Sequence, residues 1–296
     1  MSEYVISCCS TADLTKEHLN RRNINYLCFH YELDGKTYLD DMGETMPLAD
    51  FYAAMVNGAD TRTSQINITE YLDFFETFLK EGKDILHVAF SGGLSGSVNS
   101  AINAANIAME RYPERKIYVV DSLCASSGYG LLMDKVADLR DSGMGIDELR
   151  DWVEANKLNM HHWFFSTDLT FYIKGGRVSK TAGGVATILG ICPVLDMDEE
   201  GHLIPRSKAR SKKKAREDIV KRMRYLAQDG VNYSGKCYLC HSNCIEDAQA
   251  VAEMVEAEFK NIDGKPQIYD IGTTIGSHCG PGTVALFFWG KTRGEE

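Results

Sequence analysis

The strongest constraint on the fold of this chain is the order in which short apolar runs and amphipathic stretches alternate along it. Apolar runs at residues 4–9, 84–90 and 116–121 have the length of buried strands, and helical patterns follow at residues 95–111 and after residue 121. A strand-helix-strand order favours a parallel sheet that is covered by helices on both faces. The sequence therefore predicts an α/β fold built around a parallel sheet.

Local patterns between these runs predict a hairpin and two further helices. An Asp-Gly pair separates the strand-like residues 26–33 from residues 36–39, and this dipeptide favours a tight hairpin. A helix is expected at residues 47–56, with a proline near its first turn. Residues 70–80 place four aromatic rings on one helical face, which predicts a helix packed on a core.

The rhythm changes at about residue 160, where strands begin to follow one another more closely. Helical patterns at residues 211–228 and 245–260 lie between some of these strands. We therefore expect an N-terminal domain of residues 1–157 and a C-terminal domain of residues 158–296. The strand-like runs of the second part are residues 163–166, 191–197, 203–206, 236–240, 267–271 and 284–289.

Composition narrows the classes of function that the chain can serve. Its 296 residues suffice for one large or two ordinary domains. A net charge of −10 argues against a protein built mainly to bind nucleic acid or an anionic membrane. No apolar run approaches the ~18 residues of a membrane span, and the first residues lack the features of a signal peptide. We expect a cytoplasmic chain without stable membrane insertion, whose nine cysteines stay reduced.

The most informative stretch is residues 91–97, which read Ser-Gly-Gly-Leu-Ser-Gly-Ser and join a strand to a helix. Glycines there let the backbone approach a ligand, and a helix N-terminus offers free N–H groups that favour an anion. The stretch lacks the lysine of a Walker A loop. Ser97 stands where a nucleophile elbow needs its last glycine. A glycine-rich turn with serine caps is the alternative interpretation.

Two other polar stretches are candidates for the same site. Residues 61–65 read Thr-Arg-Thr-Ser-Gln and precede the aromatic-rich helix, which would place their hydroxyls near the first loop. Residues 276–283 place His278 among three glycines and a proline, in a sharp turn that can present an imidazole to a pocket. Taken alone, each stretch is more simply interpreted as a surface loop or turn.

Cys237, Cys240, His241 and Cys244 have a spacing that invites a zinc or haem interpretation. Residues 236–240 alternate like a strand, however, and an amphipathic helix begins directly after Cys244. We therefore expect these cysteines to be small buried side chains that bind no metal.

A basic stretch runs from Arg206 to Arg216 and straddles the end of a strand and the start of a helix. It has no interleaved aromatic residues, which a nucleic-acid site would use for stacking. The stretch is either a solvated face or a docking surface for an acidic partner or a phosphate.

Six motifs follow one another along nearly the whole chain. They are Ser-Thr-Ala-Asp at 10–13, Thr-Ser-Gln at 63–65, the loop at 91–97, Val-Asp-Ser at 120–122, Lys-Gly-Gly-Arg-Val-Ser-Lys at 174–180 and His-x-Gly-Pro-Gly at 278–282. Taken together and in this order, they resemble the DegV family of bacterial lipid-binding proteins. Two positions depart from the family pattern. Cys9 stands where members usually have aspartate, and Ile66 and Asn67 stand where a proline usually follows; neither change removes a hydroxyl of the expected site.

The resemblance implies a parallel-sheet α/β domain followed by a mixed-sheet α/β domain, with a long-chain fatty acid such as palmitate, stearate or oleate in a buried tunnel between them. It implies that the carboxylate is held by Thr63, by Ser95 with the adjacent Gly96, and by His278, so that residues near 272–283 contribute to the lipid site. Ser91 and Arg177 are expected as further site or partner contacts. No metal or other cofactor is required.

The resemblance also implies a carrier and not an enzyme, because related bacterial proteins present their fatty acid to a separate kinase that forms an acyl phosphate. Burial of ~15 methylenes gains on the order of 12 kcal/mol, at ~0.8 kcal/mol each. The carboxylate needs several donors, because an unpaired buried charge would offset much of that gain.

Two alternatives remain open at this point. The first is an acyl hydrolase with Ser95 as nucleophile and His278 as base, which would need a carboxylate to orient the histidine. The second is a regulatory protein whose basic stretch binds nucleic acid, against which the net acidity of the chain argues.

Overall fold

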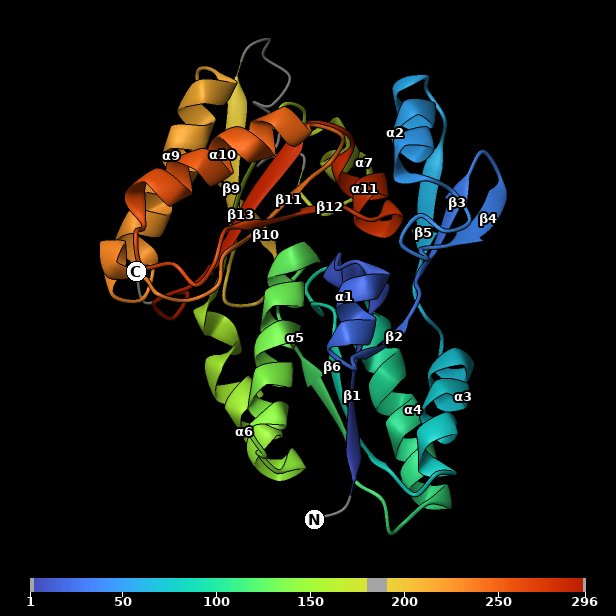
Figure 1. The fold of residues 1–296 in the computed structure, drawn as a ribbon. Helices are drawn as coiled ribbons and strands as arrows, with labels where there is room; N and C mark the ends of the chain where they lie inside the picture. Colours follow the sequence, from blue (N-terminus) through green and yellow to red (C-terminus); the bar gives the residue numbers. More distant parts are fainter. Residues whose placement is uncertain (1–2, 180–190, 295–296) are drawn as a thin grey trace.

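The computed structural model describes residues 3–179 and 191–294, which form three β-sheets surrounded by helices (Figure 1). A parallel sheet lies in the N-terminal part of the chain, a mixed sheet lies in the C-terminal part, and a small antiparallel sheet lies beside the second. The predicted α/β class, with a parallel and then a mixed sheet, is confirmed. No helix within the described residues is long and apolar enough to cross a membrane.

The parallel sheet has the strand order β2-β1-β6-β7. Its strands are β1 (Tyr4–Cys9), β2 (Asn25–Leu27), β6 (Asp84–Ala89) and β7 (Ile117–Asp121). Its helices are α1 (Lys16–Arg21), α3 (Ile68–Leu79), α4 (Ser97–Arg111), α5 (Ser126–Asp141) and α6 (Ile146–Asn156). Helices α3 and α4 lie on one side of the sheet, and α5 and α6 lie on the other (Figure 1). Every residue of β6 is buried, as is usual for a central strand of a parallel sheet, and four of its six residues are apolar.

The mixed sheet has the order β10-β9-β8-β13-β11-β12, and only its β11–β12 pair is parallel. Its strands are β8 (Met160–Ser166), β9 (Cys192–Met197), β10 (Leu203–Ala209), β11 (Tyr238–His241), β12 (Gln267–Asp270) and β13 (Thr283–Trp289). Helices α9 (Lys212–Leu226) and α10 (Ile245–Glu258) pack on one face.

The side chains of the mixed sheet alternate between two separate cores, as the two-residue period of a strand requires. Trp163 and Leu286 pack under α9 and α10, whereas Phe164 and Phe287 belong to the core shared with the N-terminal part. The second face of this sheet therefore points toward the parallel-sheet part of the molecule.

The small sheet has the order β4-β3-β5, with strands β3 (His30–Leu33), β4 (Lys36–Leu39) and β5 (Thr61–Ser64). The predicted hairpin is confirmed, because Asp34 and Gly35 both have positive φ and join β3 to β4. The prediction of one strand at residues 26–33 is wrong, since β2 and β3 belong to different sheets. Helix α2 (Leu48–Val56) packs on this sheet through a separate small core.

This small unit packs against the C-terminal half of the chain. The hydroxyl of Tyr52 donates to the carbonyl of Ile271 at 2.8 Å, and Phe171 packs on the core of the unit. Its neighbours there are the helices α7 (Thr170–Lys174) and α11 (Thr273–Cys279). The division into domains at residue 157 stays a prediction. At this position a short 3-10 helix, Lys157–Asn159, connects α6 to β8.

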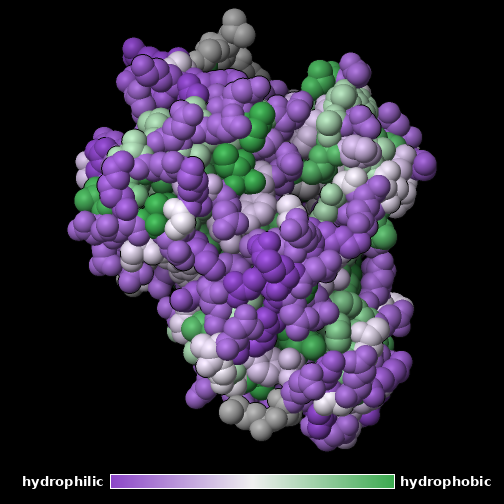
Figure 2. All heavy atoms as spheres, viewed as in Figure 1, coloured by the Kyte–Doolittle hydropathy of each residue, from purple (hydrophilic) through white to green (hydrophobic). Residues whose placement is uncertain are grey.

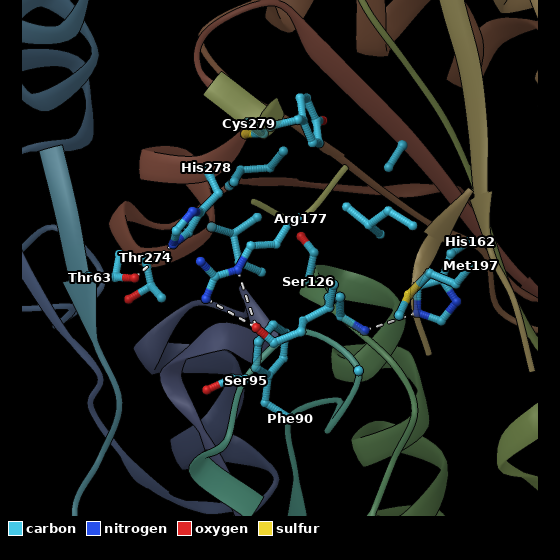
Figure 3. A pocket seen from close by; sticks show the side chains of 18 of the residues that line it. Thr63, Phe90, Ser95, Ser126, His162, Arg177, Met197, Thr274, His278 and Cys279 are labelled. Atoms are coloured by element: carbon cyan, nitrogen blue, oxygen red, sulfur yellow. Dashed lines mark hydrogen bonds between the residues drawn. The ribbon is translucent and has the colours of Figure 1, made fainter. Parts of the chain in front are cut away.

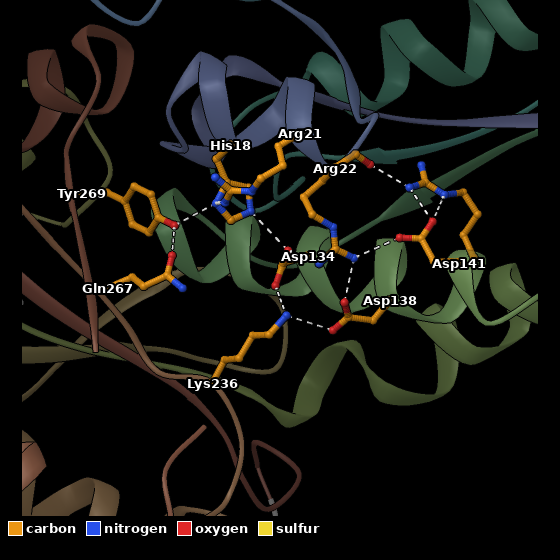
Figure 4. A network of polar contacts seen from close by, with 10 residues as sticks. His18, Arg21, Arg22, Asp134, Asp138, Asp141, Lys236, Gln267 and Tyr269 are labelled. Carbon is orange, nitrogen blue, oxygen red and sulfur yellow. Dashed lines mark hydrogen bonds and ion pairs between the residues drawn. The ribbon is translucent and has the colours of Figure 1, made fainter. Parts of the chain in front are cut away.

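A network of charged side chains joins the two larger parts (Figure 4). Asp134 of α5 accepts from His18 of α1 at 3.1 Å and pairs with Arg22 at 3.0 Å. Lys236, just before β11, binds both Asp134 and Asp138. Asp134 is only 1% exposed, so the ion pair between Lys236 and Asp134 fixes α5 to the mixed sheet through a buried carboxylate.

Most of the surface seen in Figure 2 is hydrophilic, and apolar residues there form small separate patches. The large aromatic side chains of α3 lie in the interior instead, since Tyr71 and Phe75 are fully buried against the parallel sheet. The predicted aromatic face of that helix is thereby confirmed.

Candidate ligand-binding site

A cavity of about 660 Å³ lies where the three sheets approach one another. This volume is in the range of roughly 300–1,000 Å³ that is usual for small-molecule sites. Figure 3 shows Thr63, Thr274 and His278 together on one side of the cavity, with His162 and Met197 on the opposite side. Much of its wall is apolar and comes from Phe29, Phe90, Phe164, Leu203, Ile271 and Phe287.

The polar side of the cavity is built around a contact between two predicted site residues. Thr63 Oγ1 lies 2.7 Å from Nε2 of His278, although 215 residues separate them in the sequence. Thr61 lies two residues earlier on the same face of the strand, and its hydroxyl donates to the carbonyl of Ser277. The alternation of β5 thus directs both threonines toward α11.

Two local expectations about these residues are wrong. Thr63 lies within strand β5 and not in a loop, because residues 61–64 pair with β3 in an antiparallel register. His278 lies in the last turn of helix α11 and not in a glycine-rich turn. The turn comes directly afterwards, where Gly280 and Gly282 both have positive φ.

Helix α11 is held in place at its start by two buried aspartates from the N-terminal half of the chain. Asp40 accepts from the backbone N–H and from the hydroxyl of Thr273, at 3.1 and 2.8 Å. Asp13 accepts from the N–H of Gly272 at 3.0 Å. A Cβ atom on Gly272 would lie 2.8 Å from the Asp13 carboxylate, so the close approach requires glycine. Burial, followed by the nearby Asp40, raises the pKa of Asp13 well above its usual value.

The loop that carries Ser95 connects β6 to α4, as predicted. Ser95 Oγ accepts from the N–H of Ser97 at 3.2 Å, which leaves the hydroxyl proton of Ser95 free to bind a ligand. Gly96 is the N-terminal cap of α4, and a Cβ atom there would lie 2.8 Å from the side-chain oxygen of Gln65. Both Ser95 and Gly96 line the cavity.

Ser91 does not lie among the residues that line the cavity. It is fully buried, donates to the carbonyl of Gly201 at 2.9 Å and accepts from the N–H of Gly93 at 3.2 Å. Its hydroxyl therefore fixes the loop to the start of β10 and is not brought to the other predicted site residues.

Arg177 reaches the cavity from the end of α7. Two of its nitrogens donate to the carbonyl of Leu94, at 3.2 and 3.1 Å, and a third donates to the carbonyl of Gly175 at 2.6 Å. Because Leu94 precedes Ser95, this side chain connects the loop of the parallel sheet to the C-terminal half of the chain. Burial lowers the pKa of Arg177, which nevertheless stays charged at neutral pH.

The electrostatic surroundings keep His278 neutral in the absence of an anion. Burial, and then the charge of Arg177, lower the pKa of His278 to about 4. Its Nδ1 atom is buried and has no hydrogen-bond partner among the described residues. That atom faces Gly175, where a Cβ atom would collide with it. The imidazole thus retains an unused polar atom beside the cavity.

The arrangement suits binding of an anion better than nucleophilic catalysis. His278 contacts Thr63 and not Ser95, and none of the described carboxylates makes a hydrogen bond to it. A serine nucleophile would need the histidine as its partner, and the histidine would need an orienting acid.

The cysteine-rich stretch is divided between two environments. Cys237 lies in the core under α9 and α10, whereas Cys240 lies on the opposite face of β11 and lines the cavity. The predicted strand followed by a helix is confirmed. Within residues 3–179 and 191–294, no group of three or more His, Cys, Asp or Glu side chains is arranged to hold a metal ion.

The basic stretch lies on β10 and the first turns of α9, as predicted. Lys212 pairs with Asp247 at 2.7 Å and Lys214 pairs with Glu217 at 2.6 Å, so part of its charge is neutralised locally. None of its residues lines the cavity.

Sequence reasoning missed two residues that shape the polar side. Asp40 carries no recognisable signal, because it acts on α11 across 233 residues. Thr274 lines the cavity one helical turn before His278, and the spacing of four residues would have indicated it if the segment had been predicted as a helix.

Comparisons with known sequences agree with this fold. The family model described as an uncharacterised protein of the DegV family matches residues 6–291. A DegV domain-containing protein of Clostridium perfringens is 36% identical over 294 residues, which are 99% of each chain. Another from Lactococcus lactis is 33% identical over 281 residues, which are 94% of each chain.

Two solved structures are similar over nearly the whole chain. A DegV family protein from Thermus thermophilus, described as binding fatty acid, has a TM-score of 0.86 and 26% identity, with 98% of this chain and 100% of that chain covered. A stearic acid-binding protein from Eubacterium ventriosum has a TM-score of 0.85 and 25% identity, with 96% and 97% covered. The matched family model and the identity with its curated members show that this chain belongs to the DegV family.

Proposed function

We propose that this protein binds a long-chain fatty acid, with the carboxylate at Thr63, Ser95 and His278 and the acyl chain along the apolar wall of the cavity. The observation that carries the proposal is the division of one cavity into a polar side and an apolar side. An acyl chain gains ~0.8 kcal/mol for each methylene that leaves water. The polar side supplies the hydrogen bonds that a carboxylate needs when it is removed from water.

The two structural relatives described above support the same ligand class, because one is described as binding fatty acid and the other as binding stearic acid. No nucleotide or metal takes part in the proposed binding. Palmitate, stearate and oleate are the ligands that we expect.

We further propose that the protein is a carrier that presents the carboxylate to a fatty acid kinase. Thr63 and Ser95 are only partly buried and Gly96 is exposed, whereas Phe164 and Met197 at the apolar side are buried. The carboxylate would therefore lie at the accessible end of the cavity, where a partner enzyme can reach it. The basic stretch at residues 206–216 offers a surface that suits an acidic partner.

Mass spectrometry of lipid extracted from the purified protein tests the central proposal. We expect a fatty acid to copurify, and we expect delipidated protein to take up palmitate or oleate. A protein that is reproducibly free of lipid and takes up neither acid would contradict fatty-acid binding.

Incubation with an acyl ester distinguishes the carrier from the hydrolase with Ser95 as nucleophile. A carrier releases no alcohol from the ester in the absence of a partner. Release that disappears in Ser95→Ala would support the hydrolase instead.

Charge reversal at Lys208 and Lys213, which lie in the basic stretch outside the cavity, tests the kinase partnership. We expect unchanged lipid content and slower acyl-phosphate formation by a cognate kinase, with Lys265→Glu as the control. A fall in lipid content would assign these residues to the fold or the pocket, and unchanged phosphorylation would remove them from the partner surface.

A further inference from the structure

Thr274 is a buried hydroxyl in the cavity wall that has no partner. Its side chain is 4% exposed, and Oγ1 makes no hydrogen bond to any described residue. The neighbouring hydroxyls of α11 differ, since Thr273 donates to Asp40 and Ser277 donates to the carbonyl of Thr273. Thr274 alone among these three lines the cavity.

The position of Thr274 is fixed by the helix that carries it. Thr274 and His278 are four residues apart in α11, so they lie on one face of the helix with Cβ atoms about 5–6 Å apart. Figure 3 shows Thr274 on the same side of the cavity as Thr63 and His278. The unpaired hydroxyl therefore belongs to the polar side of the cavity and not to its apolar wall.

Some of the hydrogen-bond donors at the polar side are already used within the protein and cannot bind a ligand. At neutral pH the bond between Thr63 and His278 uses one of the two protons that the pair carries. The pair therefore offers a ligand one hydrogen, either from the Thr63 hydroxyl or from Nδ1 of His278, and Ser95 offers another. Arg177 also lines the cavity, but it directs three of its five N–H groups to the carbonyls of Leu94 and Gly175. A carboxylate has about four lone-pair sites, so it can accept an additional hydrogen bond.

We infer that the hydroxyl of Thr274 donates a hydrogen bond to the carboxylate of the bound fatty acid and so helps the site distinguish an acid from a neutral lipid. This inference rests on the function proposed above. A buried hydroxyl without a partner is unfavourable, and valine has nearly the same shape without that penalty. A carboxylate within reach of Oγ1 satisfies the hydroxyl and receives a charge-assisted bond in return.

Palmitate titration of delipidated Thr274→Val tests the inference, because the two possible positions of the hydroxyl predict opposite signs. If Thr274 contacts the carboxylate, the affinity falls about 10- to 150-fold, which is the effect of one lost hydrogen bond to a charged group. If Thr274 faces the acyl chain, removal of an unpaired hydroxyl leaves the affinity unchanged or increases it, and the inference is overturned.

Three comparisons complete the test. Thr274→Ser keeps the hydroxyl and should retain most of the affinity, and Ser277→Ala, which removes a hydroxyl outside the cavity, should retain all of it. Should Thr274→Val not fold, Thr274→Ala gives the same comparison against Thr274→Ser.

Hexadecanol has the same chain without the charge and serves as the second ligand. Thr274→Val should lose much more affinity for palmitate than for hexadecanol, and equal losses would overturn the inference. Failure of the wild-type protein to bind palmitate would instead overturn the proposed function.

Discussion

Individual hydroxyls at the polar side of the cavity are expected to contribute separately to lipid affinity. Ser95→Ala and Thr63→Ala each remove one hydroxyl near a charged ligand, which costs ~1.5–3 kcal/mol or about 10- to 150-fold in affinity. The double variant should bind more weakly than either. Titration of delipidated variants with palmitate measures the effect, and Ser142→Ala, at the end of α5, is the control. Affinities equal to the wild type would remove both residues from the site.

Gly175 is expected to affect lipid affinity because it has no Cβ atom beside His278. Its φ of −75° and ψ of −9° suit any residue, so Gly175→Ala introduces no backbone strain. The new Cβ atom would, however, collide with Nδ1 of His278. We expect weaker palmitate binding with near-normal stability, and no further loss when His278→Ala is combined with Gly175→Ala, because both changes act on one contact. Additive losses would show that Gly175 acts independently of the histidine.

Among the secondary-structure elements, α5 is the one whose charge network fixes the two larger sheets to each other. Burial alone would raise the pKa of Asp134, but hydrogen bonds from His18 and Lys236 and the charges of Lys236 and Arg22 outweigh it and hold the pKa well below its usual value. Its ionised form therefore contributes stability above about pH 4, the usual range for aspartate, and the contribution disappears as the pH falls further.

We expect Asp134→Asn to lower the free energy of unfolding by about 3 kcal/mol at neutral pH, because it leaves the partner cations without their buried anion. Chemical denaturation at several pH values measures the difference. The difference from the wild type should be constant between pH 5 and 8 and should shrink below about pH 4. A difference that does not depend on pH would show that the charge is not its cause.

The elements also show how far local sequence patterns reach. Apolar runs such as β6 and the aromatic face of α3 carry their own signal, so both were predicted correctly. Strand β5 reads Thr-Arg-Thr-Ser, a polar sequence that resembles a loop. It forms a strand because it pairs with β3, and that pairing has no local sequence signal. Helix α11 is only seven residues long and is flanked by Gly272 and Gly280, and its first backbone N–H depends on Asp40, a residue far away in the sequence. The motifs predicted which residues form the site, but the positions of these residues depend on such long-range contacts.

At the scale of the whole molecule, buried histidines should make the protein sensitive to acid. Burial lowers the pKa of His87 to about 3 and that of His161 to about 4, and it holds the pKa of His162 well below its usual value. The unfolded chain protonates these groups near pH 6.5, whereas the folded protein keeps them neutral. Between about pH 4 and 6.5 the unfolded state therefore binds more protons, and stability falls as the pH falls.

The expected loss at pH 5 relative to pH 7 is about 2 kcal/mol for each histidine. Asp13 acts in the opposite direction and reduces this loss, because its raised pKa lets the folded protein hold a proton that the unfolded chain releases. Chemical denaturation of delipidated protein should thus show a net loss of stability between pH 7 and pH 5. In His161→Gln, an amide N–H can replace the histidine N–H near the carbonyl of Lys291 without titrating, so the loss should shrink by about 2 kcal/mol. Equal stability of the wild type at both pH values would contradict neutral burial of these histidines.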